Sequence, residues 1–479
     1  MEEQERKYLK KRLIFLVIAI FLAFSLIISR LWNLQIALGS QFAAKAKGNV
    51  LRYVSIPSSR GDILDKNGKL LATSVPQFAI TLDWLDMQNS KAYDPKAVIK
   101  ALANYVQPYW QGGHVSVNTI TEDILATIQL NQFNRYEPVV VMQNIPADLQ
   151  AVMAEHQQEL PGITVEARPY RVYPEQYAPI FGNILGYVRE VSESELPGFQ
   201  AKAQALGLSK TYQQGDFVGK MGVENSYDAY LRGKDGVQLM EVDNKAQPVN
   251  RLTSQDPVIG DSLKLTIDAD LQQAVSNSMD KVMGDLKSQG TSNVGAGAAV
   301  VIDVKTGKIL AMVSKPNMDP NPLIGNISDA TFNEYFGTRD QGPRLGWSRA
   351  FQEIYAPGST FKMITGMAAL QDGKVTPGEP INDSFSSLEH PEAGIADYYA
   401  YSKGAVNLDK GLADSINLYF EALGQRVMDS NPERLRQVAL QFGLGQKTGI
   451  DLPGEIAGVA PSAAWKKRIR GDLVEKRLG

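Results

Sequence analysis

The chain has 479 residues, of which 44% are hydrophobic and 21% are charged. This composition excludes a wholly disordered chain, and the length predicts two or three domains. The formal net charge of −3 argues against a strongly basic nucleic-acid binder. Cysteine is absent and histidine occurs only at His114, His156 and His390. Cysteine chemistry is therefore excluded, and we expect the chain to work without histidine.

An apolar segment follows a basic stretch at the N-terminus. The uncharged run extends from Leu13 to Ser29 and is closed by Arg30 and Trp32. As a helix it would measure roughly 25 Å, enough to span a bilayer if Arg30 snorkels. We predict a cytoplasmic tail over 1–12 and a transmembrane anchor over 13–32. The chain would then be a single-pass protein of the inner (cytoplasmic) membrane, with its bulk extracytoplasmic.

Two other interpretations of this segment compete with the anchor. A buried core helix would keep a polar face, and this run has none. A cleaved signal peptide also has a basic flank, but its apolar run is shorter and a small-residue cleavage site follows. Here ISRLWNLQIALGS follows instead, and no second apolar run approaches this length. The pattern favours a retained anchor.

The remaining chain predicts two domains of α+β class. Residues 50–260 mix strand patterns, such as 78–84 and 137–143, with helical ones such as 145–160. A segment with glycine, Arg251–Ser262, is typical of a linker. After this segment the sequence predicts a helix with Asp268 as its N-cap. A β-hairpin is predicted over 295–314. We expect a mixed α/β domain over 40–255 and a domain with a sheet flanked by helices over 262–479.

The pattern S-x-x-K occurs twice, at Ser278–Lys281 and Ser359–Lys362. Ser278 falls in the middle of a predicted helix. Ser359 follows Pro357-Gly358 and opens a helix, where free N–H groups can stabilise developing negative charge. Lys362 lies one turn further on the same face and could accept a proton from the serine hydroxyl. The alternative is an ordinary N-cap serine beside a solvated lysine.

The pattern S-x-N also occurs twice, at Ser116–Asn118 and Ser415–Asn417. Ser116 lies in a polar stretch beside two glycines and is predicted to be in a loop. Ser415 lies at the start of a helical segment, after the serine and lysine candidates. Its alternative role is again an N-cap serine, which is common.

The third pattern, K-T-G, completes the set of motifs found in serine acyl-transfer enzymes that need no histidine. Lys305–Gly307 forms the predicted hairpin turn and precedes Ser359. Lys447–Gly449 follows the other motifs, but Pro453 and the next glycine would end a central strand. We reject both as the third motif.

These motifs, in this order, resemble the class B penicillin-binding proteins, the monofunctional peptidoglycan transpeptidases, most of all the elongation (rod-shape) type. The likeness extends over nearly the whole chain. It includes segments around Arg30–Ile36, Ser58–Ala72, Arg171–Val188 and Gly219–Gly233, then YAPGSTFK and SIN. The family segment FGLGQKTGIDLPGE lies between the second and third motifs and supports the rejection of Lys447.

The resemblance implies a pedestal (dimerisation) domain, a penicillin-binding transpeptidase domain and a set of residue roles. Ser359 would attack the carbonyl between two D-alanines of a stem peptide, and Lys362 would accept its proton. Ser415 would relay a proton and Asn417 would bind the donor amide. β-Lactams would trap Ser359 covalently. No metal, organic cofactor or nucleic acid is implied, whereas a membrane glycosyltransferase and shape-complex proteins are expected partners.

One departure from the family pattern leaves alternatives open. The family continues past the Pro-Gly-Glu segment to a strand with the true K-T-G, so we expect the transpeptidase domain to be incomplete at its C-terminus and slow to acylate. A catalytically dead scaffold of the wall-synthesis complex is therefore one rival interpretation. A β-lactam sensor or hydrolase is another, disfavoured because a long pedestal precedes Ser359 and no deacylating glutamate is assignable.

Overall fold

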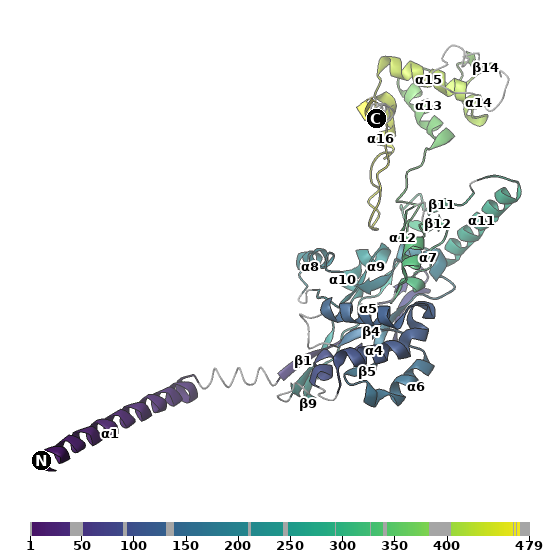
Figure 1. Cartoon of the computed structure of the whole chain (residues 1–479). Helices are drawn as coiled ribbons and strands as arrows, with labels where there is room; N and C mark the ends of the chain where they lie inside the picture. Colours follow the sequence, from purple (N-terminus) through teal and green to yellow (C-terminus); the bar gives the residue numbers. More distant parts are fainter. Residues whose placement is uncertain are drawn as a thin grey trace, which may run out of the picture.

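The computed structural model describes residues 2–38, 51–89, 93–130, 138–208, 212–242, 248–292, 294–325, 327–338, 343–382, 404–462, 464–465 and 467–469. His390 lies outside them. Figure 1 shows helices α13 to α16 grouped apart from the sheet-containing body of the molecule. The two domains expected from the sequence are present as mixed α/β structure, and each is described below.

A sheet built on one long strand organises the first domain. Strand β3 (Leu70–Leu82) pairs antiparallel with β5 (Ile163–Val172) along ten register positions, and also with β2 (Ile63–Leu64) and β4 (Val139–Met142). Strand β10 (Leu263–Lys264) pairs parallel with β2. Residues 263–264, which the sequence analysis assigned to the second domain, therefore belong to the main sheet of the first domain.

Three helices pack against β3 and β4: α4 (Pro95–Val106), α5 (Val117–Leu130) and α6 (Ala147–Glu155). Helix α4 begins at an Asp94 cap that accepts the Lys96 N–H, and its apolar residues recur on one buried face. The buried members of this core include Ile80, Leu82, Ile99, Leu102, Ile120 and Leu149. Four shorter elements complete this part of the domain: α3 (Trp84–Asn89), β6 (Val188–Glu190), α8 (Leu196–Ala205) and β7 (Phe217–Gly219).

A second sheet contains part of the segment that was predicted to be a linker. Strands β1 (Leu51–Ile56), β8 (Gly236–Val242) and β9 (Pro248–Gln255) form an antiparallel sheet in the order β1–β8–β9. The prediction of a linker over Arg251–Ser262 was wrong for 251–255, which pair with β8. Polar side chains are compatible with this strand because its backbone groups are satisfied by β8 while its side chains from Leu252 to Gln255 remain exposed.

The second domain begins with the elements that the sequence predicted. Asp268 accepts the N–H groups of Asp270 and Leu271 and caps α11 (Ala269–Ser288). Strands β11 (Gly297–Ile302) and β12 (Ile309–Lys315) form the predicted hairpin. Helix α12 (Asp329–Phe336) follows.

A buried cluster joins the two domains. It combines Phe181 and Leu185 of α7 (Ala178–Leu185) with Leu231 of α10 (Asp228–Leu231), and it continues to Met312 of β12. Helix α9 (Gly222–Ser226) contributes Val223, and Leu452 joins from the segment that follows α16 (Arg434–Gln441). Gln272 of α11 also donates to the carbonyls of Ile180 and Met312, so hydrogen bonds as well as apolar packing join the two domains.

The helical group has its own core. Helices α13 (Lys362–Gln371), α15 (Asn417–Ser430) and α16 (Arg434–Gln441) pack together, with α14 (Leu408–Ala413) and the strand pair β13 (Ile381–Asn382) and β14 (Ala405–Val406) alongside. The buried side chains include Ile364, Ala368, Phe420, Leu423 and Val438.

The N-terminal segment is a helix, as predicted, but its predicted role is not confirmed. Helix α1 (Glu2–Trp32) contains the residues predicted as an anchor and exposes apolar side chains such as Phe21 and Leu26. In the described part of the chain, none of the helices combines the length and the apolar character needed to cross a membrane.

Candidate active site

Ser359 lies at the entrance to α13, where the sequence placed it. It belongs to a 3₁₀ turn, Gly358–Phe361, that leads directly into the helix, and its carbonyl accepts the N–H of Lys362. Gly358 has a φ of 57°, a value that favours glycine. The side chain of Ser359 is exposed, so a substrate can approach it.

Lys362 connects the two predicted motifs. Its Nζ lies 2.6 Å from the carbonyl oxygen of Ser415, 3.0 Å from Ser415 Oγ and 2.6 Å from Asn417 Oδ1. It also lies 5.7 Å from the centre of the Phe420 ring. The lysine is half-buried rather than solvated, which disfavours the interpretation as a freely exposed surface lysine.

The turn between α14 and α15 presents Ser415 and Asn417. The N–H of Ile416 donates to Gly411, and the buried Ile416 side chain anchors the turn in the core of the helical group. Ser415 has a φ of 53°, a left-handed conformation that is unfavourable for a residue with a side chain. Ile416, not Ser415, is the N-cap of α15. The alternative of an N-cap serine is therefore wrong.

Close packing of α13 on α15 fixes these groups relative to one another. Phe420 of α15 and Leu408 of α14 both pack over Gly366 of α13, because a Cβ atom at that position would meet them at ordinary contact distances of 3.5 and 3.4 Å. Lys362 is at the first turn of α13 and Asn417 at the first residue of α15. The contact between the two motifs is thus a consequence of how their helices pack.

The arrangement has the parts of a histidine-free acyl-transfer site. A serine hydroxyl at a helix start can act as nucleophile, and an amine one turn away can exchange a proton with it. Ser415 Oγ provides a second hydroxyl on the same amine. The structure joins Lys362, Ser415 and Asn417 by hydrogen bonds, and Ser359 lies on the 3₁₀ turn that leads into the helix of Lys362.

The rejected motifs lie elsewhere. Ser278 is in the middle of α11, and Ser116 accepts the N–H of Thr119 at the start of α5. Lys305 belongs to the β11–β12 turn. Lys447 is in neither a helix nor a strand, and the N–H and hydroxyl of Thr448 both donate to Glu455.

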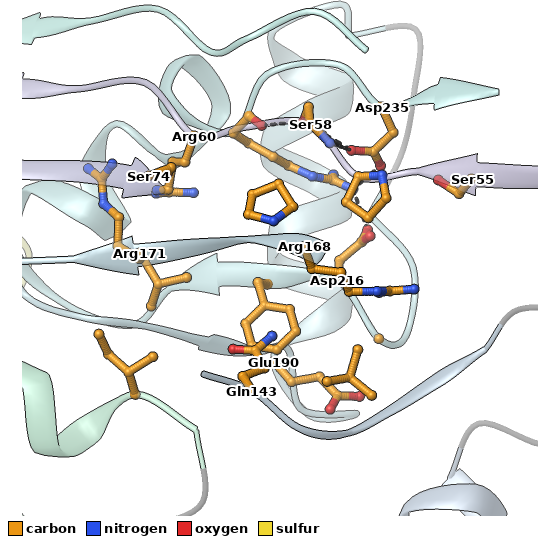
Figure 2. A pocket seen from close by; sticks show the side chains of 18 of the residues that line it. Ser55, Ser58, Arg60, Ser74, Gln143, Arg168, Arg171, Glu190, Asp216 and Asp235 are labelled. Atoms are coloured by element: carbon orange, nitrogen blue, oxygen red, sulfur yellow. Dashed lines mark hydrogen bonds and ion pairs between the residues drawn. The ribbon is translucent and has the colours of Figure 1, made fainter. Parts of the chain in front are cut away.

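The sequence did not predict a buried ionic cluster in the first domain. Figure 2 shows two of its members, Arg60 and Arg171, at the wall of a pocket. Arg60 donates to Glu224 at 2.5 Å and pairs with Asp228 at 2.8 Å, and Arg171 donates to Glu224 at 2.7 Å. Burial disfavours the charged form of Glu224, yet the two guanidinium groups outweigh it and lower the pKa of that carboxyl. All four residues fall in segments that carried the family resemblance, but no local pattern predicts their pairing.

The two families that match the chain correspond to its two domains. The Penicillin-binding Protein dimerisation domain matches residues 55–265, and the Penicillin binding protein transpeptidase domain matches residues 297–477.

Curated relatives agree with these matches. The peptidoglycan D,D-transpeptidase MrdA of Acinetobacter baumannii is 29% identical over 98% of this chain and 63% of its own length. The protein of the same name from Escherichia coli K12 is 27% identical over 98% of this chain and 69% of its own. This chain therefore spans about two thirds of the length of these relatives.

Two solved structures have a similar fold. A penicillin-binding protein (PBP2) from Helicobacter pylori, solved in complex with MreC, has a TM-score of 0.65, 23% identity and coverage of 88% of this chain and 71% of its own. A structure concerned with polymerization and crosslinking by a peptidoglycan synthase complex has a TM-score of 0.56, 25% identity and coverage of 96% and 72%. Because the dimerisation domain and the transpeptidase domain both match, one after the other along the chain, the protein belongs to the class B penicillin-binding proteins, and it is similar to their elongation-type members.

Proposed function

We propose that this chain carries the acylation machinery of a peptidoglycan D,D-transpeptidase that acts in cell-wall elongation and cell shape. The main support is the contact of Lys362 with Ser415 and Asn417, which joins two motifs around one amine. The activity printed in the names of the curated relatives agrees with this chemistry. D-Ala-D-Ala stem peptides are the proposed substrates, and β-lactams are the proposed covalent inhibitors.

In the proposed reaction, Ser359 Oγ attacks the carbonyl between the two D-alanines and its proton passes to the neutral amine of Lys362. N–H groups at the helix start stabilise the oxyanion. The Ser415 hydroxyl, 3.0 Å from Lys362 Nζ, relays the proton to the leaving amine, so that D-alanine departs and a serine ester remains. The amine of a second stem peptide then attacks this ester, restores Ser359 and forms the cross-link.

Labelling with fluorescent penicillin tests this proposal. Because the chain spans 63% of the length of one curated relative, the experiment uses a version extended to the relatives' length beside the 479-residue chain. Ser359→Ala should abolish labelling of the extended version, and the matched control Ser278→Ala should leave it intact. Labelling that survives Ser359→Ala would show that the wrong serine was chosen.

We also propose that α1 anchors the chain in the cytoplasmic membrane, with the two domains on the outer side. The support is its exposed apolar side chains, among them Leu16, Phe21 and Leu26. Protease added to spheroplasts should digest the chain beyond 39 and spare the N-terminus. Protection of the two domains would contradict this topology.

Shape-complex proteins and a membrane glycosyltransferase are the proposed partners. The support is that the Helicobacter pylori neighbour was solved with MreC and that another neighbour belongs to a peptidoglycan synthase complex. Co-purification from membranes, with a form lacking 51–255 as the comparison, tests whether the pedestal carries these contacts. Equal recovery of partners by both forms would contradict the proposal.

A further inference from the structure

The aromatic ring of Phe420 borders the amine of Lys362. The nitrogen of that amine, Nζ, lies over the ring, 5.7 Å from its centre. Asn417, whose Oδ1 lies 2.6 Å from the same nitrogen, precedes Phe420 by three positions on α15. Because residues three apart share a face of a helix, one turn of α15 presents both an amide oxygen and an aromatic ring to the amine.

The core of the helical group holds this ring in place. Phe420 is only 5% exposed. Its ring meets the ring of Tyr419 edge-on, with 5.3 Å between the two centres, and it packs over Gly366 of α13. A ring that is fixed in this way does not have to reorganise when a charge appears beside it, so it can act on that charge throughout the reaction.

Core packing alone does not require an aromatic residue at this position. Leu423, on the next turn of α15, fills the same core with an aliphatic side chain. What an aromatic ring adds is its electron-rich face, which attracts a cation within about 6 Å of the ring centre. The separation between Lys362 Nζ and the centre of the Phe420 ring lies within this range. Phe420 therefore has a property that affects the amine only when the amine is charged.

The amine changes its charge during acylation. In the proposed reaction Lys362 is neutral when Ser359 attacks, and it becomes an ammonium group as it takes the proton. The face of the Phe420 ring attracts the ammonium group but not the neutral amine, so it stabilises the transition state more than the resting state. A carboxylate in the place of the ring would instead hold the amine in its charged form, which cannot accept a proton.

We infer that Phe420 is a positioning residue for Lys362: its ring orients the amine and stabilises the positive charge that the amine gains on accepting the proton of Ser359. This inference rests on the proposed acyl transfer and adds to it a residue outside the S-x-x-K and S-x-N motifs. The electron density of the ring, and not only its size, should then control the acylation rate.

Fluorination of the ring tests this inference, because fluorine atoms withdraw electrons from the ring face and change the size of the ring little. The extended version is made with mono-, di- and trifluorophenylalanine in place of Phe420. Acylation by benzylpenicillin is followed by stopped flow on the alkaline plateau of the rate, where the resting amine is neutral. The rate should fall with each added fluorine, by about two- to fivefold in total, as expected for the loss of a cation–π contact. A rate that stays level or rises with fluorination would overturn the inference.

Two controls separate the charge effect from other effects of fluorine. The same residues in place of Phe181, which is buried and meets Tyr177 edge-on, should leave the rate unchanged. In Lys362→Arg the charge stays constant during the reaction, so trifluorophenylalanine at position 420 should leave the residual rate unchanged. An equal fall at position 181, or in the Lys362→Arg background, would show that the ring does not act through the charge of Lys362 and would overturn the inference.

The outcome for Ser359→Ala distinguishes a failure of this inference from a failure of the proposed function. Penicillin labelling that survives Ser359→Ala would overturn both. If Ser359→Ala abolishes labelling and Lys362→Arg slows acylation, while the fluorinated series acylates at the parent rate, the proposed function stands and the inference alone is overturned.

Discussion

Lys362 Nζ lies 2.6 Å from Asn417 Oδ1, although the two residues are 55 positions apart in the chain. The contact places an amine from the first turn of α13 against an amide from the first residue of α15. The amide of Asn417 therefore positions the amine of Lys362, and the amine positions the amide. Replacement of either residue should change the acylation rate.

Replacement of Lys362 by arginine separates charge from proton transfer. The Lys362→Arg variant would keep a cation near Ser415 and Asn417, but a guanidinium does not lose its proton in proteins. Acylation should fall by about 10²–10⁴, the usual contribution of a positioned general base. Stopped-flow acylation of the extended version measures this, with thermal melting as the check on folding. A Lys362→Arg variant that acylates at the parent rate would contradict a role for Lys362 as base.

The left-handed backbone at Ser415 gives a matched pair of variants. Ser415→Ala and Ser415→Gly both remove the hydroxyl that contacts Lys362, and both should slow acylation. Only glycine relieves the cost of a φ of 53°. The glycine variant should therefore be more stable than the alanine variant by about 1 kcal/mol, in line with the penalty for left-handed conformation. Equal melting temperatures would show that the turn stores no such strain.

Much of this site could be predicted from the chain. Ser359 was recognisable because Pro357-Gly358 ends a turn before a helical pattern. In the structure Ser359 does lie in the turn that leads into α13. The Ser415 backbone was not predictable, because no local preference favours a serine at positive φ. It belongs to the turn that ends α14, in which the N–H of Ile416 donates to the carbonyl of Gly411 and the residue between the helix end and Ile416 is left-handed. The strand over 251–255 was missed for a related reason, since its pairing with β8 depends on residues far away rather than on its own polar side chains.

Lys447 provides a test of the rejected third motif. Thr448 and Gly449 donate backbone N–H groups to Glu455 and so form a closed loop outside the helices and strands. Lys447→Ala should therefore change the acylation rate by less than about twofold, because an exposed loop charge contributes little. A drop comparable to that of Lys362→Arg would mean that this lysine reaches the reacting groups.

The buried cluster around Glu224 should make the pedestal sensitive to acid. Because the pKa of Glu224 is lowered in the folded chain, its contribution to stability is present above the unfolded pKa of about 4.3 and is lost as pH falls through the folded pKa. Glu224→Gln should cost about 3–5 kcal/mol at pH 7, since it leaves Arg60 and Arg171 without their shared carboxylate. The cluster was not predictable because it joins β5, α9, α10 and the segment before β2.

Melting curves of the parent and of Glu224→Gln between pH 7 and pH 3 check this expectation. The difference between their melting temperatures should narrow below about pH 4.3, where the parent begins to lose the contribution of the charged carboxylate. Glu166→Gln is a suitable control, because the Glu166–Arg168 pair lies nearer the surface. A difference that stays constant with pH would contradict a charged Glu224 in the folded cluster.

Peptide mapping of a penicillin adduct tests the acyl-transfer proposal most directly. The extended version is incubated with benzylpenicillin, digested and examined by mass spectrometry for the residue that carries the penicilloyl group. One adduct per chain on Ser359 is expected, and it should form much more slowly in Lys362→Arg. An adduct on Ser278, Ser415 or any other residue, with Ser359 unmodified, would contradict the assignment of the nucleophile.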